Sequence, residues 1–143
     1  SSSGWAQGHC TADEQSLFTC TVGKKVLSVC GSKKLDGKQG VLQYRYGPLG
    51  KPDMVYPDPP QHPAKHFTAN LLYSSVEQSR IMELAFRRGD TEYSVYTEDI
   101  RGKRGAGVTV NVRGQSTDRK CTHLKGTSNF DSNIQALDLP QPK

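Results

Sequence analysis

Apolar and polar residues alternate in short runs along most of the chain, and glycine or proline usually separates one run from the next. The clearest run is 108–113, where valine occupies every second position and Thr109, Asn111 and Arg113 stand between. A period of two is typical of strands that bury one face of a sheet. No segment of about ten residues has helical periodicity. The pattern therefore predicts about eight or nine short strands joined by turns.

The runs that we interpret as strands are Leu17–Val22, Lys25–Cys30, Val41–Tyr46, Met54–Tyr56, His66–Ser74, Ile81–Arg88, Glu92–Glu98, Val108–Val112 and Lys120–Leu124. The first two flank Gly23-Lys24, which predicts a hairpin with a two-residue turn. In that register one face is apolar and carries Phe18, Cys20, Val22, Leu27 and Val29. The other face is polar and carries Thr19, Thr21 and Ser28, as a half-solvated antiparallel sheet requires.

Two segments interrupt the alternation. Pro57 ends the run Met54–Tyr56, and the proline-rich stretch from there to Pro63 cannot form a central strand or a helix. Arg101–Gly107 combines glycines with basic residues and is predicted to be a flexible hairpin loop.

The strand spacing predicts an all-β fold, either a small antiparallel β-barrel or a strongly curved sheet of about eight strands, with little helix. A length of 143 residues suits one domain. We expect a flexible N-terminal lead over 1–16, a single β domain over 17–126 and a polar C-terminal tail over 127–143. Within that tail, Ile134–Leu137 could form a single helical turn.

The chain contains four cysteines, Cys10, Cys20, Cys30 and Cys121. An even number without any Cys-x-x-Cys spacing favours two disulfides over a metal site. In a closed barrel the last strand pairs with the first, which predicts Cys20–Cys121 and leaves Cys10–Cys30. The alternative is Cys20–Cys30. With the two-residue turn these two side chains point to opposite faces of the hairpin, and a three-residue turn would bring them to the same face.

Disulfides indicate an oxidising compartment, so we expect a periplasmic or secreted protein. The chain opens on Ser1–Gly4 without a methionine, which is typical of a mature chain whose export signal has been removed. The longest apolar runs span only a few residues, so no transmembrane segment is predicted.

The charge is uneven: Lys and Arg number 19 against 14 Asp and Glu, giving +5. Between positions 101 and 125 one acid, Asp118, stands among seven bases, which are Arg101, Lys103, Arg104, Arg113, Arg119, Lys120 and Lys125. A local basic field attracts phosphates, acidic proteins or anionic polymers. The other interpretation is a solvated loop and strand face.

No arrangement of residues points to catalysis, so we expect a protein that is not an enzyme and uses no cofactor or metal. There is no Gly-x-Ser-x-Gly nucleophile motif, and Pro63 breaks the helix that would align His62 with His66. Tyr44 and Tyr46 share one strand face and flank Arg45. Tyrosine and arginine are enriched at recognition surfaces.

Several runs resemble small exported bacterial proteins of uncharacterised function. The resemblance spans about residues 10–125 and rests on Leu17–Cys20, Val26–Cys30, Gly40–Gly47, Val55–Pro57, Glu92–Tyr96 and Ala106–Val110. The aromatic-x-Cys of the first strand and the late cysteine are also similar, more weakly, to the small β-barrels that inhibit c-type lysozyme in the bacterial envelope. That family's Ser-Gly loop has no counterpart, because the nearest loop, Arg104–Gly107, lacks the serine.

We therefore expect a non-enzymatic exported bacterial binding or inhibitor-like protein that acts through the loops of a disulfide-braced β-barrel. Arg101, Lys103 and Arg104 would make electrostatic contact, and Tyr44 and Tyr46, with Arg45 between them, would anchor the partner. The alternative is a binder of anionic envelope polymers, either glycan or lipid headgroups, through the basic stretch 101–125. The partner is expected to be a protein or an anionic envelope component and not a nucleic acid.

Overall fold

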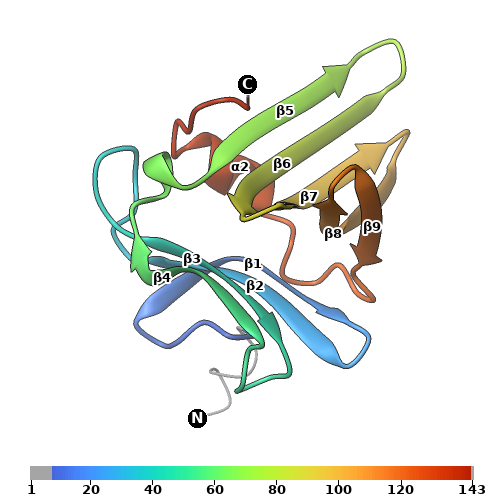
Figure 1. Ribbon diagram of the computed structural model, residues 1–143. Coiled ribbons are helices and arrows are strands. Elements are labelled where there is room, and N and C mark those ends of the chain that lie inside the picture. Colours follow the sequence, from blue (N-terminus) through green and yellow to red (C-terminus); the bar gives the residue numbers. More distant parts are fainter. Residues whose placement is uncertain (1–7, 143) are drawn as a thin grey trace.

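The computed structural model describes residues 8–142, which form two antiparallel sheets and very little helix (Figure 1). The expectations for residues 1–7, including the Ser1–Gly4 opening, lie outside the described residues. The four-stranded sheet has the order β1 (Glu14–Val22), β2 (Lys25–Ser32), β3 (Leu42–Gly47) and β4 (Met54–Gln61). The five-stranded sheet has the order β5 (Thr68–Ser74), β6 (Ser79–Arg88), β7 (Thr91–Ile100), β8 (Lys103–Val112) and β9 (Gln115–Lys120). The helical elements are η1 (Pro63–Lys65) and α2 (Phe130–Gln135).

The all-β prediction is confirmed, but neither sheet closes into a barrel. The edge of β1 is instead lined by residues 121–126, which we call the seam segment. The Thr122 N–H donates to the Thr21 carbonyl at 2.7 Å, and the Thr19 N–H donates to the Gly126 carbonyl at 3.0 Å. The predicted strand Lys120–Leu124 is therefore wrong, since the last strand is β9 and the seam segment follows it.

The predicted disulfides are both present, Cys20–Cys121 and Cys10–Cys30, and the described residues include no free cysteine. The first hairpin also has the predicted register. Val22 pairs with Lys25 across the Gly23-Lys24 turn, and Cys20 pairs with Leu27. Cys20 therefore faces inward, as predicted, and reaches Cys121 on the seam segment.

Aromatic side chains hold the two sheets together. The Phe86 ring of β6 lies between Tyr56 of β4, at 4.4 Å between centroids, and Tyr93 of β7, at 4.8 Å. Both pairs are stacked nearly parallel. Aromatic pairs contribute beyond the area that they bury, so this stack is a main contact between the sheets.

The segment predicted as a polar tail belongs to the core. Phe130 and Ile134 of α2 are fully buried, and the Phe130 ring meets Phe18 of β1 edge-on at 5.2 Å. Leu137, just after the helix, is buried as well. Positions 130, 134 and 137 fall on one helical face, so a single short turn buries all three. The boundary at 127 therefore does not mark the end of the packed domain.

The other predicted boundary also moves. Residues 8–13 are held against the four-stranded sheet and β1 begins at Glu14, so the flexible lead predicted over 1–16 does not extend through this part. The strand Met54–Tyr56 does not stop at Pro57 either, because β4 runs on to Gln61. Proline has no N–H to donate to a neighbouring strand, so it is excluded from central strands, which are bonded on both sides. β4 is an edge strand, where the missing N–H is tolerated.

The predicted loop Arg101–Gly107 is mostly strand. Only Arg101-Gly102 form the turn, and β8 starts at Lys103. Gly105 and Gly107 are strand positions that leave room for side chains from β7. A β-carbon on Gly105 would lie 2.9 Å from the Glu98 carboxylate, and one on Gly107 would lie 2.5 Å from a backbone carbonyl of β9. The glycines therefore serve close packing on the outer sheet face and not loop flexibility.

Candidate functional site

Tyr44 and Tyr46, the predicted anchors, are core residues. Tyr44 is 0% exposed and its ring contacts Phe86 at 4.9 Å. Tyr46 is buried too, with the Arg119 guanidinium 5.0 Å from its ring centre. Even-numbered positions of β3 face the opposite sheet because successive strand residues point to opposite faces. Neither ring is therefore placed to contact a partner, and burial raises the pKa of Tyr44.

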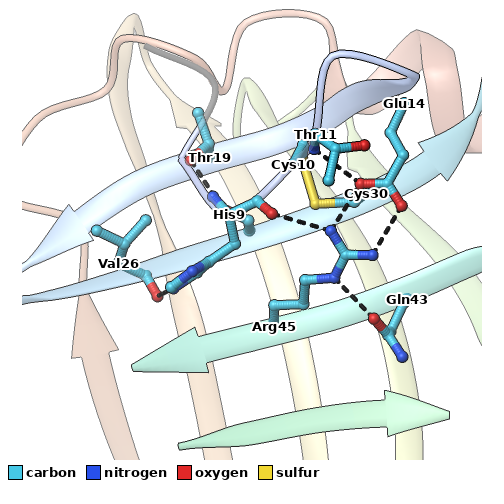
Figure 2. The surroundings of a disulfide bond; sticks show 10 residues. His9, Cys10, Thr11, Glu14, Thr19, Val26, Cys30, Gln43 and Arg45 are labelled. Carbon is cyan, nitrogen blue, oxygen red and sulfur yellow. Dashed lines mark hydrogen bonds and ion pairs between the residues drawn. A yellow bond between two sulfur atoms is a disulfide. The ribbon is translucent and has the colours of Figure 1, made fainter. Parts of the chain in front are cut away.

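Arg45 lies on the outer face of the four-stranded sheet and is committed to a polar network (Figure 2). Two of its nitrogens donate to the Glu14 carboxylate, each at 2.7 Å. One of them also donates to the His9 carbonyl at 2.9 Å. The Arg45 side chain keeps only 12% exposure, so it acts inside the molecule.

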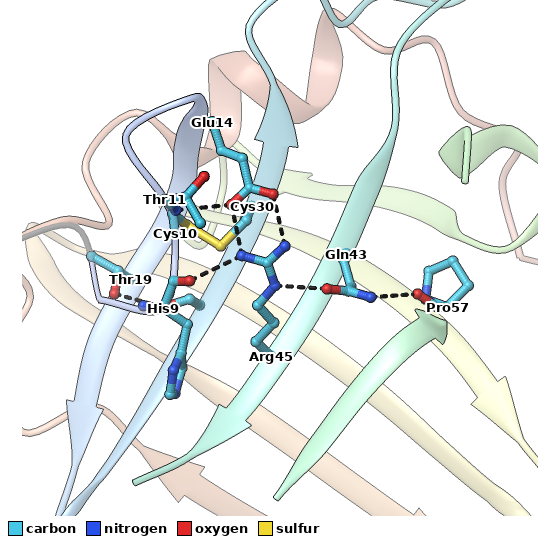
Figure 3. A network of polar contacts seen from close by, with 10 residues as sticks. His9, Cys10, Thr11, Glu14, Thr19, Cys30, Gln43, Arg45 and Pro57 are labelled. Atoms are coloured by element: carbon cyan, nitrogen blue, oxygen red, sulfur yellow. Dashed lines mark hydrogen bonds and ion pairs between the residues drawn. A yellow bond between two sulfur atoms is a disulfide. The ribbon is translucent and has the colours of Figure 1, made fainter. Parts of the chain in front are cut away.

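The same network extends to β4 and to the first described residues (Figure 3). The Arg45 Nε donates to Gln43, whose amide donates to the Pro57 carbonyl at 2.8 Å. The His9 amide donates to the Ser28 hydroxyl at 3.1 Å, and the Cys10–Cys30 disulfide lies beside it. These bonds fasten residues 9–14 and β4 to the central strands of the sheet.

Replacing Glu14 with glutamine tests this network through its pH dependence. The hydrogen bonds from Arg45 lower the pKa of Glu14 below its ordinary value of 4.5. A carboxylate with a lowered pKa stabilises the fold above its unfolded-state pKa, and this stabilisation is lost as the pH falls through the folded-state pKa. We expect Glu14→Gln to lower the free energy of unfolding by about 1–3 kcal/mol at pH 7, and the gap from the wild type to narrow below pH 4.5.

Urea unfolding at pH 7 and at pH 3 measures that gap, with Glu77→Gln as the control because Glu77 is exposed in a turn. A gap that stays constant over this range would show that the ion pair does not carry the effect.

The basic run 101–125 does not form one surface. The Arg101-Gly102 turn lies at one end of the five-stranded sheet and the Arg113-Gly114 turn lies at the other, because β8 runs between them. Arg113 pairs with Asp90 at 3.1 Å, and Arg119 points inward over Tyr46. The seven bases therefore do not share one face, since Arg101, Lys103 and Arg104 lie at one end, Arg113 lies at the other and Arg119 points toward the four-stranded sheet.

Exposed apolar side chains gather at the end of the five-stranded sheet that carries Arg101. Of the seven large apolar residues that are exposed, five lie there, namely Leu71, Leu72, Tyr73, Val76 and Ile100. Val76 is 90% exposed and Tyr73 is 66% exposed. Figure 1 shows the β5–β6 hairpin projecting past the four-stranded sheet, so no second layer covers its end.

The neighbouring β7–β8 turn adds positive charge to this end. The Arg101 amide donates to the Gln78 carbonyl at 2.8 Å, and its Nε donates to the Glu77 carbonyl at 3.3 Å, so the two turns lie side by side. In the β7–β8 ladder, Lys103 lies opposite Ile100 and Arg104 lies opposite Asp99. We call this surface the sheet tip, and its members are Leu71, Leu72, Tyr73, Val76, Ile100, Arg101, Lys103 and Arg104.

The three predicted basic residues lie at the tip, whereas the two tyrosines predicted as anchors do not. The sequence carries a signal for the exposed apolar residues, because Leu71, Leu72 and Tyr73 are consecutive apolar residues in a predicted strand. With a period of two, such a run cannot bury all its side chains on one face. At least one apolar side chain must then remain outside the core.

The rest of the described chain was compared with the requirements of a histidine pair, a metal site and a membrane span. His62 contacts the Asp36 carbonyl and His66 contacts the Gln61 side chain, so the two histidines have separate partners. Within residues 8–142, His, Cys, Asp and Glu form no group of three that could hold a metal ion. Neither helix in this part of the chain has the length and apolar character needed to cross a membrane.

Comparison with protein-family models, with curated proteins and with solved structures gave no match.

Proposed function

We propose that the protein is a non-enzymatic exported binding protein whose sheet tip inserts into an apolar cleft of a partner protein. The observation that supports this most is the concentration of exposed apolar side chains at one projecting end. Leu71 and Tyr73 point to one face of β5 and Leu72 points to the other, so the apolar side chains surround the end of the hairpin. Exposed apolar clusters mark interaction sites in soluble proteins. The two disulfides are compatible with an exported protein.

The chemistry of the tip indicates what the partner presents. Val76 and Tyr73 are the most exposed of the large apolar side chains, and a projecting apolar end fits a concave apolar surface. Arg101 contacts the turn that carries Val76, through the Gln78 and Glu77 carbonyls, so acidic groups at the rim of the cleft would add favourable contacts. A hairpin that fills a cleft is the action expected of an inhibitor-like protein.

The alternative function, binding an anionic polymer through the stretch 101–125, has less support. Such binding is favoured by bases that share one face, whereas Arg113 lies at the opposite end from Arg101 and pairs with Asp90, and Arg119 points toward the ring of Tyr46. The tip carries apolar anchors, which a charged polymer does not require.

Removing the apolar anchors tests the proposal. Capture on immobilised oxidised protein from envelope extracts is quantified by mass spectrometry for the wild type and for Tyr73→Ser/Val76→Ser. Because central anchors carry most of the binding energy, we expect the enriched partner to fall by at least about tenfold. The matched control is Leu49→Ser/Val112→Ser, since both residues are exposed but lie outside the tip.

The charged residues of the tip should respond differently. Arg101→Ser/Lys103→Ser/Arg104→Ser should slow association and leave the free energy of unfolding within about 0.5 kcal/mol. Binding through an apolar centre should also persist partly at 1 M salt, where charges are screened beyond about 3 Å. Equal capture by the tip variant and by its control would contradict the proposal.

A further inference from the structure

The four sheet edges differ in how they are protected from pairing with another strand. Edge strands are ordinarily guarded by proline, by charge or by a covering segment. The edge strand β4 contains three prolines, β1 is lined by the seam segment, and β9 carries Asp118, Arg119 and Lys120. In β5 over 70–74, the sequence Asn-Leu-Leu-Tyr-Ser contains neither proline nor charge.

The backbone of β5 is open over the same residues. Among the described residues, Ala69 is the one position in β5 that bonds away from β6, through its amide to the Pro140 carbonyl at 2.9 Å. In an antiparallel strand the outward-pointing groups recur every second residue. Leu71 and Tyr73 therefore direct their N–H and C=O groups outward, with no backbone partner in the described part of the chain. Figure 1 shows β5 as the outer strand of its sheet.

Charge at this edge permits an identical strand to approach. No residue from 67 to 76 is charged, although the chain carries +5. On the adjacent strand, Arg80 is cross-strand to Tyr73 and is neutralised by Asp131 at 2.6 Å. Two copies of this edge would therefore meet with little repulsion.

We propose that β5 pairs with β5 of a second copy of the chain, antiparallel about a two-fold axis at Leu72. In this register the backbone N–H and C=O groups of Leu71 form hydrogen bonds with those of Tyr73 in the second copy. The backbone groups of Tyr73 do the same with Leu71 of the second copy. Leu72 then faces Leu72 of the second copy on the outer sheet face. The register uses the open groups of both strands, and the Ala69 amide stays with Pro140.

This dimer extends beyond the proposed function and shares part of its surface. Pairing occupies Leu71, Leu72 and Tyr73 of the sheet tip, whereas the β7–β8 turn lies two strands away, at about 10 Å. Arg101, Lys103 and Arg104 therefore remain accessible in the dimer. A closed two-fold contact also uses up the open edge, so it does not propagate into a fibre.

The test is the mass of the intact oxidised protein in solution. Analytical ultracentrifugation over a concentration series should show a monomer–dimer equilibrium for the wild type. Leu72→Lys places two like charges face to face across the axis and should raise the dissociation constant at least about tenfold. Val112→Lys is the matched control, because Val112 and Leu72 are both 44% exposed, and it should dimerise as the wild type does.

A mixture of variants tests the two-fold register itself. Because position 72 faces its own copy, Leu72→Lys mixed with Leu72→Glu should dimerise when neither dimerises alone. A wild type that stays monomeric throughout the series would overturn the proposal. So would Leu72→Lys dimerising as tightly as Val112→Lys. Both results are independent of partner capture, so failure of the dimer and failure of the proposed function can be told apart.

Discussion

Replacing Cys20 and Cys121 together with alanine should lower the free energy of unfolding by about 4–5 kcal/mol. The disulfide joins residues 101 positions apart, so its loss restores a large loop entropy to the unfolded chain. It also frees the seam segment, whose bonds to Thr19 and Thr21 cover the edge of β1. Equilibrium unfolding in guanidinium under non-reducing conditions measures the loss.

The internal control is the other disulfide. Cys10 and Cys30 are separated by 20 residues, so Cys10→Ala/Cys30→Ala should cost about 3 kcal/mol on the same loop-entropy argument. A larger loss from the short loop than from the long one would show that local contacts, and not chain entropy, dominate at these positions.

Phe130→Ala should cost about 3–5 kcal/mol, the range for a fully buried aromatic residue. The ring is 0% exposed and packs edge-on against Phe18, so its removal leaves a cavity between α2 and β1. The same unfolding experiment applies, with Ser132→Ala as the control on the exposed side of the same helix. That control should stay within about 0.5 kcal/mol.

This comparison also decides whether residues after 126 belong to the folded unit. A loss below about 1 kcal/mol for Phe130→Ala would mean that α2 is dispensable, as the polar-tail prediction implied. The slope of the free energy of unfolding against denaturant concentration should be nearly the same for Phe130→Ala and the wild type. This slope scales with the surface exposed on unfolding, to which the short helix α2 contributes little.

Local patterns in the sequence were sufficient to predict most of the strands and which side chains of the first hairpin share a face. The two-residue turn at Gly23-Lys24 sets which side chains share a face, because the strand period is two. That register predicts that Cys20 faces inward, and the pairing with Cys121 rests in addition on the expectation that the last strand closes a barrel against the first. The pairing is right, although the segment that carries Cys121 follows the last strand and the sheets do not close.

Contacts between segments distant in the chain decided the rest. Whether Tyr44 faces a partner or the opposite sheet depends on Phe86, which lies 42 residues further along and stacks in the core. The same holds for Arg45, whose ion pair with Glu14 joins β1 to β3 across a strand. A pattern within one strand cannot reveal which of its faces another layer will cover.

By itself, then, the sequence determined the all-β class, the first hairpin and the basic character of the Arg101 turn. Each of these depends on residues close in the chain. The pairing Cys20–Cys121 joins residues 101 positions apart, and the sequence predicted it from a closed barrel that the structure does not form. Only the tertiary structure decided where the proposed binding surface lies. It buried Tyr44 and Tyr46, divided the basic run between two ends and left Tyr73 and Val76 without a covering layer. The physical reason is that burial is set by the facing sheet, and the end of the β5–β6 hairpin points away from the four-stranded sheet.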